Sequence, residues 1–322
     1  MRILVTNDDG VHAPGLAAIT RALAAWSALS PDQDQRQVIV AAPLTNQSGA
    51  GAAIGTVFER ESVAYRAVTV PGAETVPAFG LDASPALAVI LGLLGAFGPP
   101  PDLIVSGINL GVNIGRSILH SGTVGATLTG AQMGTSGLAV SLRSDGERHH
   151  WETAAEVAVS LLRVLSDAPA RTVLNLNVPS IPLPELRGIR RGKMSSAAVI
   201  KGVTRVEDED GGTDERSVAG AEQPERAFAP ADQRERVRES GSRRDARSGP
   251  RPGEGIIVLH RGTAVPSLGD VSDEGPDEDG ALVAAGYASL TALTAITESR
   301  SVVTDRLVAR ALADAQARLI EG

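Results

Sequence analysis

The sequence predicts an α/β fold, in which a doubly wound, mostly parallel sheet carries a smaller C-terminal extension. Short runs rich in Val, Ile and Leu alternate with longer segments of helical periodicity, which is the pattern of βαβ units. The 322 residues are 43% hydrophobic but only 2% aromatic. Aliphatic side chains must therefore form the core, as is common where helices cover both faces of parallel strands.

The first two elements follow directly from the spacing of apolar residues. The run Ile3-Leu4-Val5 predicts a strand, and Leu16, Ile19, Leu23 and Trp26 share one face of a helix that starts at Pro14. The later elements are assigned by the same reasoning. We expect strands at 38–40, 103–105, 138–140, 173–177, 255–259 and 287–290, and helices at 86–97, 121–131, 151–165 and 299–320.

The chain divides into three parts by composition. Residues 1–200 are expected to form the catalytic α/β core. Residues 201–252 are dense in Glu, Asp, Arg, Gly and Pro with little apolar periodicity, which predicts a flexible charged insertion. Residues 253–322 are expected to complete the domain and to supply contacts between subunits.

Charge and composition exclude several functional classes. A net charge of −8 and a pI of about 5.2 argue against a nucleic-acid-binding surface. The chain has no Cys, so disulfides and cysteine nucleophiles are excluded. The N-terminus does not read as a signal peptide, and no apolar stretch has the length of a membrane span. We therefore expect a cytoplasmic protein.

The strongest local signal is Thr6-Asn7-Asp8-Asp9-Gly10, directly after the first strand. Ligands of doubly wound sheets bind at the carboxyl ends of the strands, where this segment would lie. Adjacent carboxylates repel each other, and a hard divalent cation would relieve that repulsion. An Asx-rich turn before the next helix would explain the same residues without any function, and the pentapeptide alone leaves both interpretations open.

Two further loops carry polar groups beside glycines. The segment Asn46-Gln47-Ser48-Gly49-Ala50-Gly51 offers neutral oxygens that could bind a cation or a phosphate. The segment from Ser106 to Gly125 has glycines at 107, 111 and 115 that allow close approach to a ligand, and Ser121-Gly122-Thr123 then opens a helix. Helix N-termini bind phosphate well. A purely structural, glycine-rich connection is the alternative.

Together these segments resemble the SurE survival-protein family. The resemblance rests on residues 1–16 (MRILVTNDDGVHAPGL), 46–51 (NQSGAG) and 105–130 (VSGINLGVNIGRSILHSGTVGATLTG), with LNLNVP at 174–179 and GYASLTAL at 286–293. It implies a Rossmann-like domain whose C-terminal part is exchanged between subunits in dimers or tetramers. It also implies a 5′/3′-nucleotidase that uses a divalent metal to remove phosphate from nucleoside monophosphates.

The resemblance assigns roles to single residues. Asp8, Asp9, Ser48 and Asn109 correspond to the metal ligands, and Mg²⁺ or Mn²⁺ is the expected ion. Ser121, Gly122 and Thr123 match the phosphate-binding loop, and Asn113 belongs to the same glycine-rich wall. With the polar loops, the expected phosphate contacts are Asn46, Gly107, Asn113, Ser121, Gly122 and Thr123, and the catalytic set is Asp8, Asp9 and Asn109.

The predicted activity is hydrolysis of nucleoside 5′- or 3′-monophosphates to nucleoside and phosphate, with water as the expected nucleophile. The residues leave open whether Asp8 instead acts as base or nucleophile. A catalytically weak nucleotide-binding sensor, or a scaffold protein of the same fold, is the alternative function. A further expectation is that Gly122→Val blocks the substrate while it spares metal binding.

Overall fold

The computed structural model describes residues 1–29, 36–55, 57, 59, 61–143, 148–195, 200–207, 255–261 and 275–294. One compact unit comprises residues 1–197 and 265–322, and a second comprises 198–264. The expected helix at 299–320 and most of the charged 201–252 segment lie outside the described residues. In that segment the structure describes only strand β9 (Ile200–Glu207), which pairs antiparallel with β10 (Gly255–Arg261).

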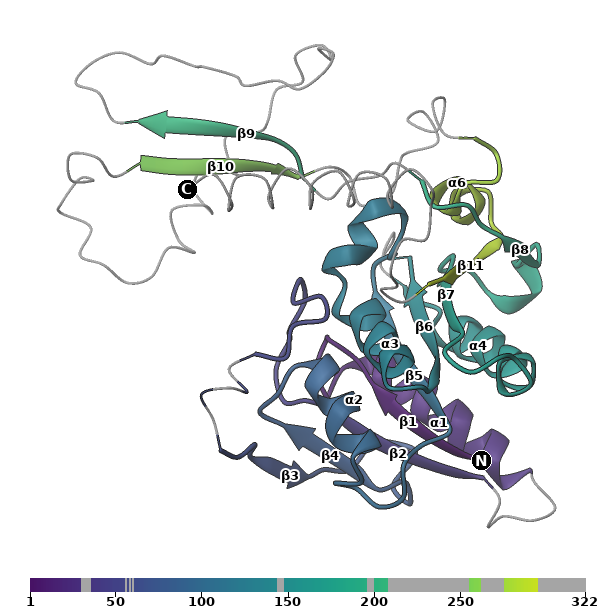
Figure 1. Cartoon of the computed structure of the whole chain (residues 1–322). Helices are drawn as coiled ribbons and strands as arrows, with labels where there is room; N and C mark the ends of the chain where they lie inside the picture. The colour runs from purple at the N-terminus through teal and green to yellow at the C-terminus, as the bar shows by residue number, and fades with distance from the viewer. Residues whose placement is uncertain are drawn as a thin grey trace, which may run out of the picture. The chain divides into compact units, whose positions relative to one another are not determined.

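The larger unit is built on a nine-stranded sheet with the order β3-β4-β2-β1-β5-β6-β7-β11-β8 (Figure 1). The six strands from β4 to β7 are parallel, which confirms the predicted mostly parallel sheet. Strands β3 and β11 run antiparallel to their neighbours β4 and β7. The strands are β1 (Arg2–Thr6), β2 (Gln37–Pro43), β3 (Tyr65–Ala67), β4 (Ala78–Leu81), β5 (Leu103–Leu110), β6 (Ser136–Leu142), β7 (Val173–Val178), β8 (Ile189–Arg191) and β11 (Ala288–Leu293).

Helices cover both faces of this sheet. Helices α1 (Pro14–Ala28) and α4 (Trp151–Ser166) pack together against β5, and α2 (Pro85–Leu93) and α3 (Gly122–Gln132) pack together on the other face. Short helical turns are η2 (Gly115–His120), η3 (Leu183–Glu185) and α6 (Asp279–Ala284). None of the helices in the described ranges is long and apolar enough to cross a bilayer.

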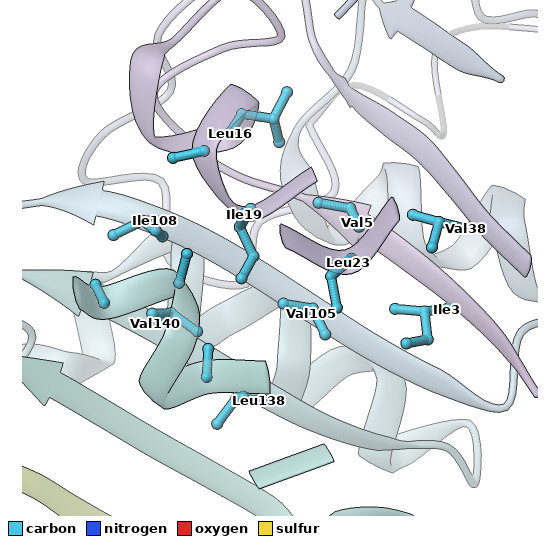
Figure 2. Close-up of a cluster of buried hydrophobic side chains, with 14 of the residues drawn as sticks. Ile3, Val5, Leu16, Ile19, Leu23, Val38, Val105, Ile108, Leu138 and Val140 are labelled. Atoms are coloured by element: carbon cyan, nitrogen blue, oxygen red, sulfur yellow. The ribbon is translucent and has the colours of Figure 1, made fainter. Parts of the chain in front are cut away.

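Alternation along β1 divides the core into two clusters. Ile3 and Val5 point to the α1 side and Leu4 to the α2 side, because successive strand side chains face opposite ways. Figure 2 shows the larger cluster, in which Leu16, Ile19 and Leu23 of α1 meet the strand residues. The apolar spacing that predicted this helix therefore reflects its buried face.

Two helix boundaries illustrate the local rules. Helix α2 ends at Leu93 rather than at the expected residue 97, because Gly95 and Gly98 adopt positive φ angles of 88° and 107° and three prolines follow. Helix α3 begins where expected, because the Ser121 hydroxyl accepts a hydrogen bond from the Val124 N–H at 3.1 Å.

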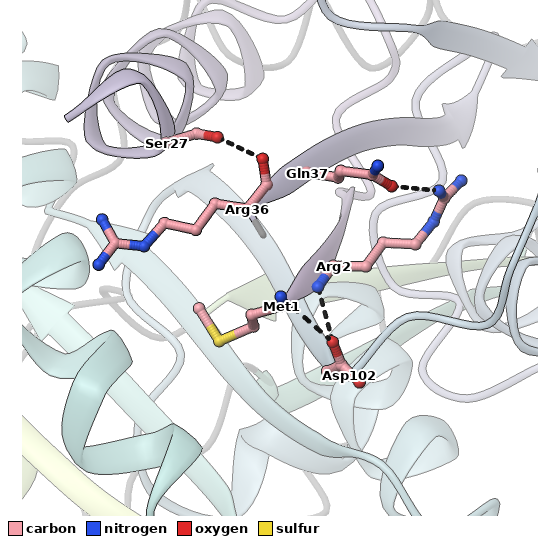
Figure 3. A network of polar contacts seen from close by, with 6 residues as sticks. All are labelled: Met1, Arg2, Ser27, Arg36, Gln37 and Asp102. Carbon is pink, nitrogen blue, oxygen red and sulfur yellow. Dashed lines mark hydrogen bonds and ion pairs between the residues drawn. The ribbon is translucent and has the colours of Figure 1, made fainter. Parts of the chain in front are cut away.

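The amino ends of the strands are fastened by polar contacts at the edge opposite the predicted site (Figure 3). The Arg2 N–H donates to the Asp102 carboxylate at 2.7 Å, and the Arg2 guanidinium donates to Gln37 at 2.9 Å. These contacts link β1 to its two neighbours, β5 and β2. The loops that carry the candidate functional residues lie at the opposite edge, at the carboxyl ends of the strands.

Candidate active site

The two aspartates lie at the carboxyl end of β1, where the connections of the doubly wound sheet diverge to opposite faces. Helix α1 follows β1 on one face, and the neighbouring strand β5 leads through η2 into α3 on the other. Such a point is where open α/β sheets bind ligands. The positions of Asp8 and Asp9 in this structure therefore agree with the expectation from the sequence.

Asp8 is buried, with 3% of its surface exposed, and α3 encloses it. The Thr123 hydroxyl donates to Asp8 Oδ1 at 2.6 Å. A Cβ atom built on Gly122 would lie 2.7 Å from Asp8 Cβ and 2.9 Å from Asp8 Oδ2. Glycine is required at 122 because the aspartate occupies the space that a side chain would take.

Asp9 is half-buried beside Asp8. Burial, followed by repulsion from the Asp8 carboxylate, raises the pKa of Asp9 from 3.8 to about 6, although a hydrogen bond from the Leu110 N–H at 3.3 Å lowers it. Two carboxylates held this way disfavour each other's charge, which is the arrangement a divalent cation stabilises.

The 46–51 loop contacts both Asp8 and the end of η2, which leads into α3. The Gln47 N–H donates to the backbone carbonyl of Asp8 at 2.6 Å, and the Gly51 N–H donates to the His120 carbonyl at 3.1 Å. Asn46 and Ser48 are exposed, and the Asn46 side chain accepts from the Ser48 N–H at 2.8 Å. This Asx turn fixes the backbone conformation of residues 46–48.

Asn109 lies near the end of β5, where the Leu110 N–H contacts Asp9. Its side-chain amide donates to the Gly111 carbonyl at 2.7 Å. The carboxamide nitrogen is therefore occupied, and the carboxamide oxygen is the atom suited to a cation.

Two of the expected phosphate contacts, Gly107 and Asn113, make structural contacts within the chain. Gly107 is buried within β5, and the Val140 carbonyl lies where its side chain would be, so the close approach that it permits is to β6. The Asn113 side chain donates to Ser141 at 2.8 Å, and its backbone N–H donates to Asn177 at 2.7 Å. Asn113 therefore anchors the loop to β6 and β7.

The N-terminus of α3 remains suited to an anion. Ser121 caps α3 by accepting a hydrogen bond from the Val124 N–H. Among the described residues, no acceptor is found for the N–H groups of Gly122 and Thr123. Free N–H groups and the positive end of the helix dipole favour a phosphate oxygen. Because Gly122 touches Asp8, the expectation that Gly122→Val would spare metal binding is not supported by this geometry.

The donor set fits a hard divalent cation. In the described parts of the chain no group of three or more His, Cys, Asp or Glu residues could hold a metal. A cation would therefore draw on Asp8 and Asp9 and on neutral oxygens, which Mg²⁺ and Mn²⁺ accept.

One positioning residue, Asp279, was not found from the sequence. Its carboxylate is 1% exposed and accepts three backbone hydrogen bonds, from Gly115 at 2.9 Å, Ser195 at 3.1 Å and Gly280 at 3.0 Å. The C-terminal segment thus holds the loop that leads into α3. A separation of 164 residues between Asp279 and Gly115 hides the contact from local patterns.

We expect Asp279→Asn to lower the free energy of unfolding by about 2 kcal/mol, since an amide nitrogen would face buried N–H donors. Asp277→Asn is the matched control, because the Asp277 side chain is exposed and forms an ion pair with Lys193 at 3.7 Å. Chemical denaturation of both variants measures the difference. Equal stability would contradict the role assigned to Asp279.

Asp9 should make the stability of metal-free protein depend on pH. Its pKa is higher in the folded state, about 6, than its ordinary value of 3.8. Between these pH values the folded protein therefore binds more protons than the unfolded chain. The stability that protonation of Asp9 contributes is fully present below about pH 4 and is lost as the pH rises through about 6. With a chelator present, wild-type protein should lose more thermal stability from pH 4 to 7 than Asp9→Asn. An equal change in melting temperature with pH for both proteins would refute this prediction.

Comparisons with known proteins agree with the fold and identify the family. Residues 3–201 match the family described as Survival protein SurE. The chain is 40% identical over 215 residues to the 5′/3′-nucleotidase SurE of Cronobacter sakazakii, covering 66% of this chain and 77% of that protein. The 5′/3′-nucleotidase SurE of Edwardsiella ictaluri is 39% identical over 215 residues, with 66% and 76% covered. The crystal structure of the Aquifex aeolicus SurE protein shares the fold with a TM-score of 0.64, at 23% identity and with 95% and 98% of the two chains covered.

Proposed function

Because this chain belongs to the Survival protein SurE family, we propose that it is a 5′/3′-nucleotidase that releases phosphate from nucleoside monophosphates. The observation that supports this most is the pairing of Asp8 with the N-terminus of α3. The Thr123 hydroxyl contacts the carboxylate at 2.6 Å, so a cation site and a phosphate site would adjoin. Adjacent sites of this kind suit a phosphomonoester.

In this proposal Asp8, Asp9, Ser48 and Asn109 hold one divalent cation, Mg²⁺ or Mn²⁺. The ion, when bound, supplies positive charge that polarises the phosphoryl group and offsets the charge developing on its oxygens. Thr123 orients Asp8 through its hydroxyl, as partners of metal ligands commonly do.

The remaining groups bind and orient the substrate. The N–H groups of Gly122 and Thr123 donate to phosphate oxygens, and the dipole of α3 favours the same charge. Ser121 keeps the first turn of this helix in place by capping it. We further propose that water is the nucleophile. We also propose that the protein assembles as a homodimer or homotetramer, which sedimentation would measure.

Phosphate release tests the proposal. Purified protein should release phosphate from adenosine 5′- and 3′-monophosphates with Mn²⁺ or Mg²⁺ present, and a chelator should abolish release. Binding of the nucleotides without turnover under all these conditions would instead favour the sensor function. If the protein neither bound the nucleotides nor hydrolysed them, the scaffold function would be favoured.

A further inference from the structure

Strand β7 lies between β6 and β11 in the sheet (Figure 1) and carries two buried asparagines. Leu176 and Val178 of this strand pack into the larger core cluster. Because successive side chains point to opposite faces, Asn175 and Asn177 lie on the other face, where they are 1% and 0% exposed. Burying a carboxamide costs free energy unless its hydrogen bonds are made, so the partners of these side chains indicate their role.

Both side chains converge on the backbone of Asn113. The Asn177 side-chain oxygen accepts a hydrogen bond from the Asn113 N–H at 2.7 Å, and its amide group donates to the Asn113 carbonyl at 2.9 Å. Asn175 donates to the same carbonyl at 2.8 Å, but its own oxygen has no hydrogen-bond partner among the described residues. Asn177 therefore binds both backbone groups of Asn113, whereas Asn175 binds one of them.

Asn113 lies in the segment that connects the two halves of the candidate site. Residues 109–122 run from the end of β5 to the start of α3. At the first end, the Leu110 N–H donates to the Asp9 carboxylate at 3.3 Å. At the other end, Gly122 lies against Asp8. A residue that is fixed within this connection restricts where both ends can lie.

Gly111 links the fixed Asn113 to Asn109. Its carbonyl accepts a hydrogen bond from the Asn109 side-chain amide at 2.7 Å, and its N–H donates to the Leu142 carbonyl at 2.8 Å. Its φ of 117° turns the chain at this point, in a conformation that glycine adopts readily. The direction of the Asn109 carboxamide therefore depends on the place of Gly111. Leu142 holds Gly111 directly, and Asn177 holds the chain two residues later.

We propose that Asn177 is a positioning residue of the active site, which acts by holding both backbone groups of Asn113. This contact sets where the Asn109 carboxamide oxygen and the Leu110 N–H lie. The inference rests on the proposed function, in which Asn109 and Asp9 hold the cation. Groups that orient metal ligands from one step away commonly determine metal affinity. The alternative is that the buried asparagines contribute to stability alone.

Asn177→Leu tests this role, because leucine fills a similar volume but makes neither hydrogen bond to Asn113. Affinity for Mn²⁺ per folded molecule should fall about tenfold, the lower end of the range for groups that orient metal ligands. Phosphate release should fall at limiting Mn²⁺ and should recover as Mn²⁺ approaches saturation. Calorimetric titration and phosphate-release assays measure these effects. A purely structural role would lower the melting temperature and leave the affinity per folded molecule unchanged.

Asn175→Leu is the matched control. It changes the same residue type on the same strand and face, at nearly the same burial, but Asn113 keeps its N–H acceptor and one donor to its carbonyl. This variant should lower the melting temperature to a comparable extent and keep Mn²⁺ affinity near that of the wild type. Equal losses of affinity in both variants, or no loss in either, would overturn the assignment of Asn177.

Hydrogen exchange adds a measurement that needs neither metal nor substrate. In Asn177→Leu, amide exchange should become faster at Leu110 and Gly111, followed in peptides that end before Asn113. In Asn175→Leu it should stay near that of the wild type. If the wild-type protein bound no Mn²⁺ and released no phosphate, the proposed function would fail, and exchange would still decide whether Asn177 positions this segment. Equal exchange in the two variants would show that it does not.

Discussion

Asp8→Asn should abolish most phosphate release and most affinity for Mn²⁺ or Mg²⁺. The change removes one negative charge from the pair that would hold the cation, and an amide nitrogen would take the place of one carboxylate oxygen. Partners one step removed from a metal already contribute about 10- to 100-fold to affinity or activity. A direct ligand should exceed that, so we expect losses of about 100-fold or more in both quantities.

Calorimetric titration with Mn²⁺ and phosphate-release assays measure the two losses on the same preparation. Asp102→Asn is the control, because that carboxylate accepts the Arg2 N–H at the opposite edge of the sheet and is exposed. It should alter neither quantity. Unchanged Mn²⁺ affinity in Asp8→Asn would remove Asp8 from the ligand set.

Several of the strands that the sequence predicted, such as β1, β5 and β6, are buried on both faces, although the largely buried strand β4 (Ala78–Leu81) was not predicted. Ile3-Leu4-Val5 is fully buried, and a short continuous apolar run followed by turn residues is typical of a central parallel strand. Tyr65–Ala67 and Ile189–Arg191 were missed because all six residues are exposed on short peripheral strands. Their pairing depends on the neighbouring strand, which a local window of sequence does not contain.

The candidate site also combines local and long-range features. Asp8 and Asp9 were predicted as site residues because two carboxylates after an apolar strand are chemically unusual. The contact of Gly122 with Asp8 was missed, since it joins residues more than a hundred positions apart, and glycine alone does not say what it approaches. The resemblance assigned Thr123 to the phosphate-binding loop, and in the structure its hydroxyl donates a hydrogen bond to Asp8.

The contact between α3 and Asp8 leads to the second large expected effect. Gly122→Ala places a methyl group 2.7 Å from Asp8 Cβ and 2.9 Å from Asp8 Oδ2, so the carboxylate or the helix must move. Either movement separates the cation site from the N–H groups that would hold the phosphate. A misplacement of about 1 Å can cost about 100-fold in rate, which is the loss of turnover that we expect. Metal affinity should fall with it.

Gly130→Ala in the same helix separates this effect from a general loss of packing. A Cβ at Gly130 would meet Ile104 Cγ1 at 2.9 Å, which is also a clash, but inside the apolar core below α3. Gly130→Ala should therefore lower the melting temperature while turnover per folded molecule stays near wild type. Gly122→Ala should lose turnover and weaken inhibition by free phosphate at a comparable melting temperature. If the two variants lost stability and activity in the same proportion, α3 would serve packing alone, and the phosphate site would have to be sought elsewhere on the carboxyl edge.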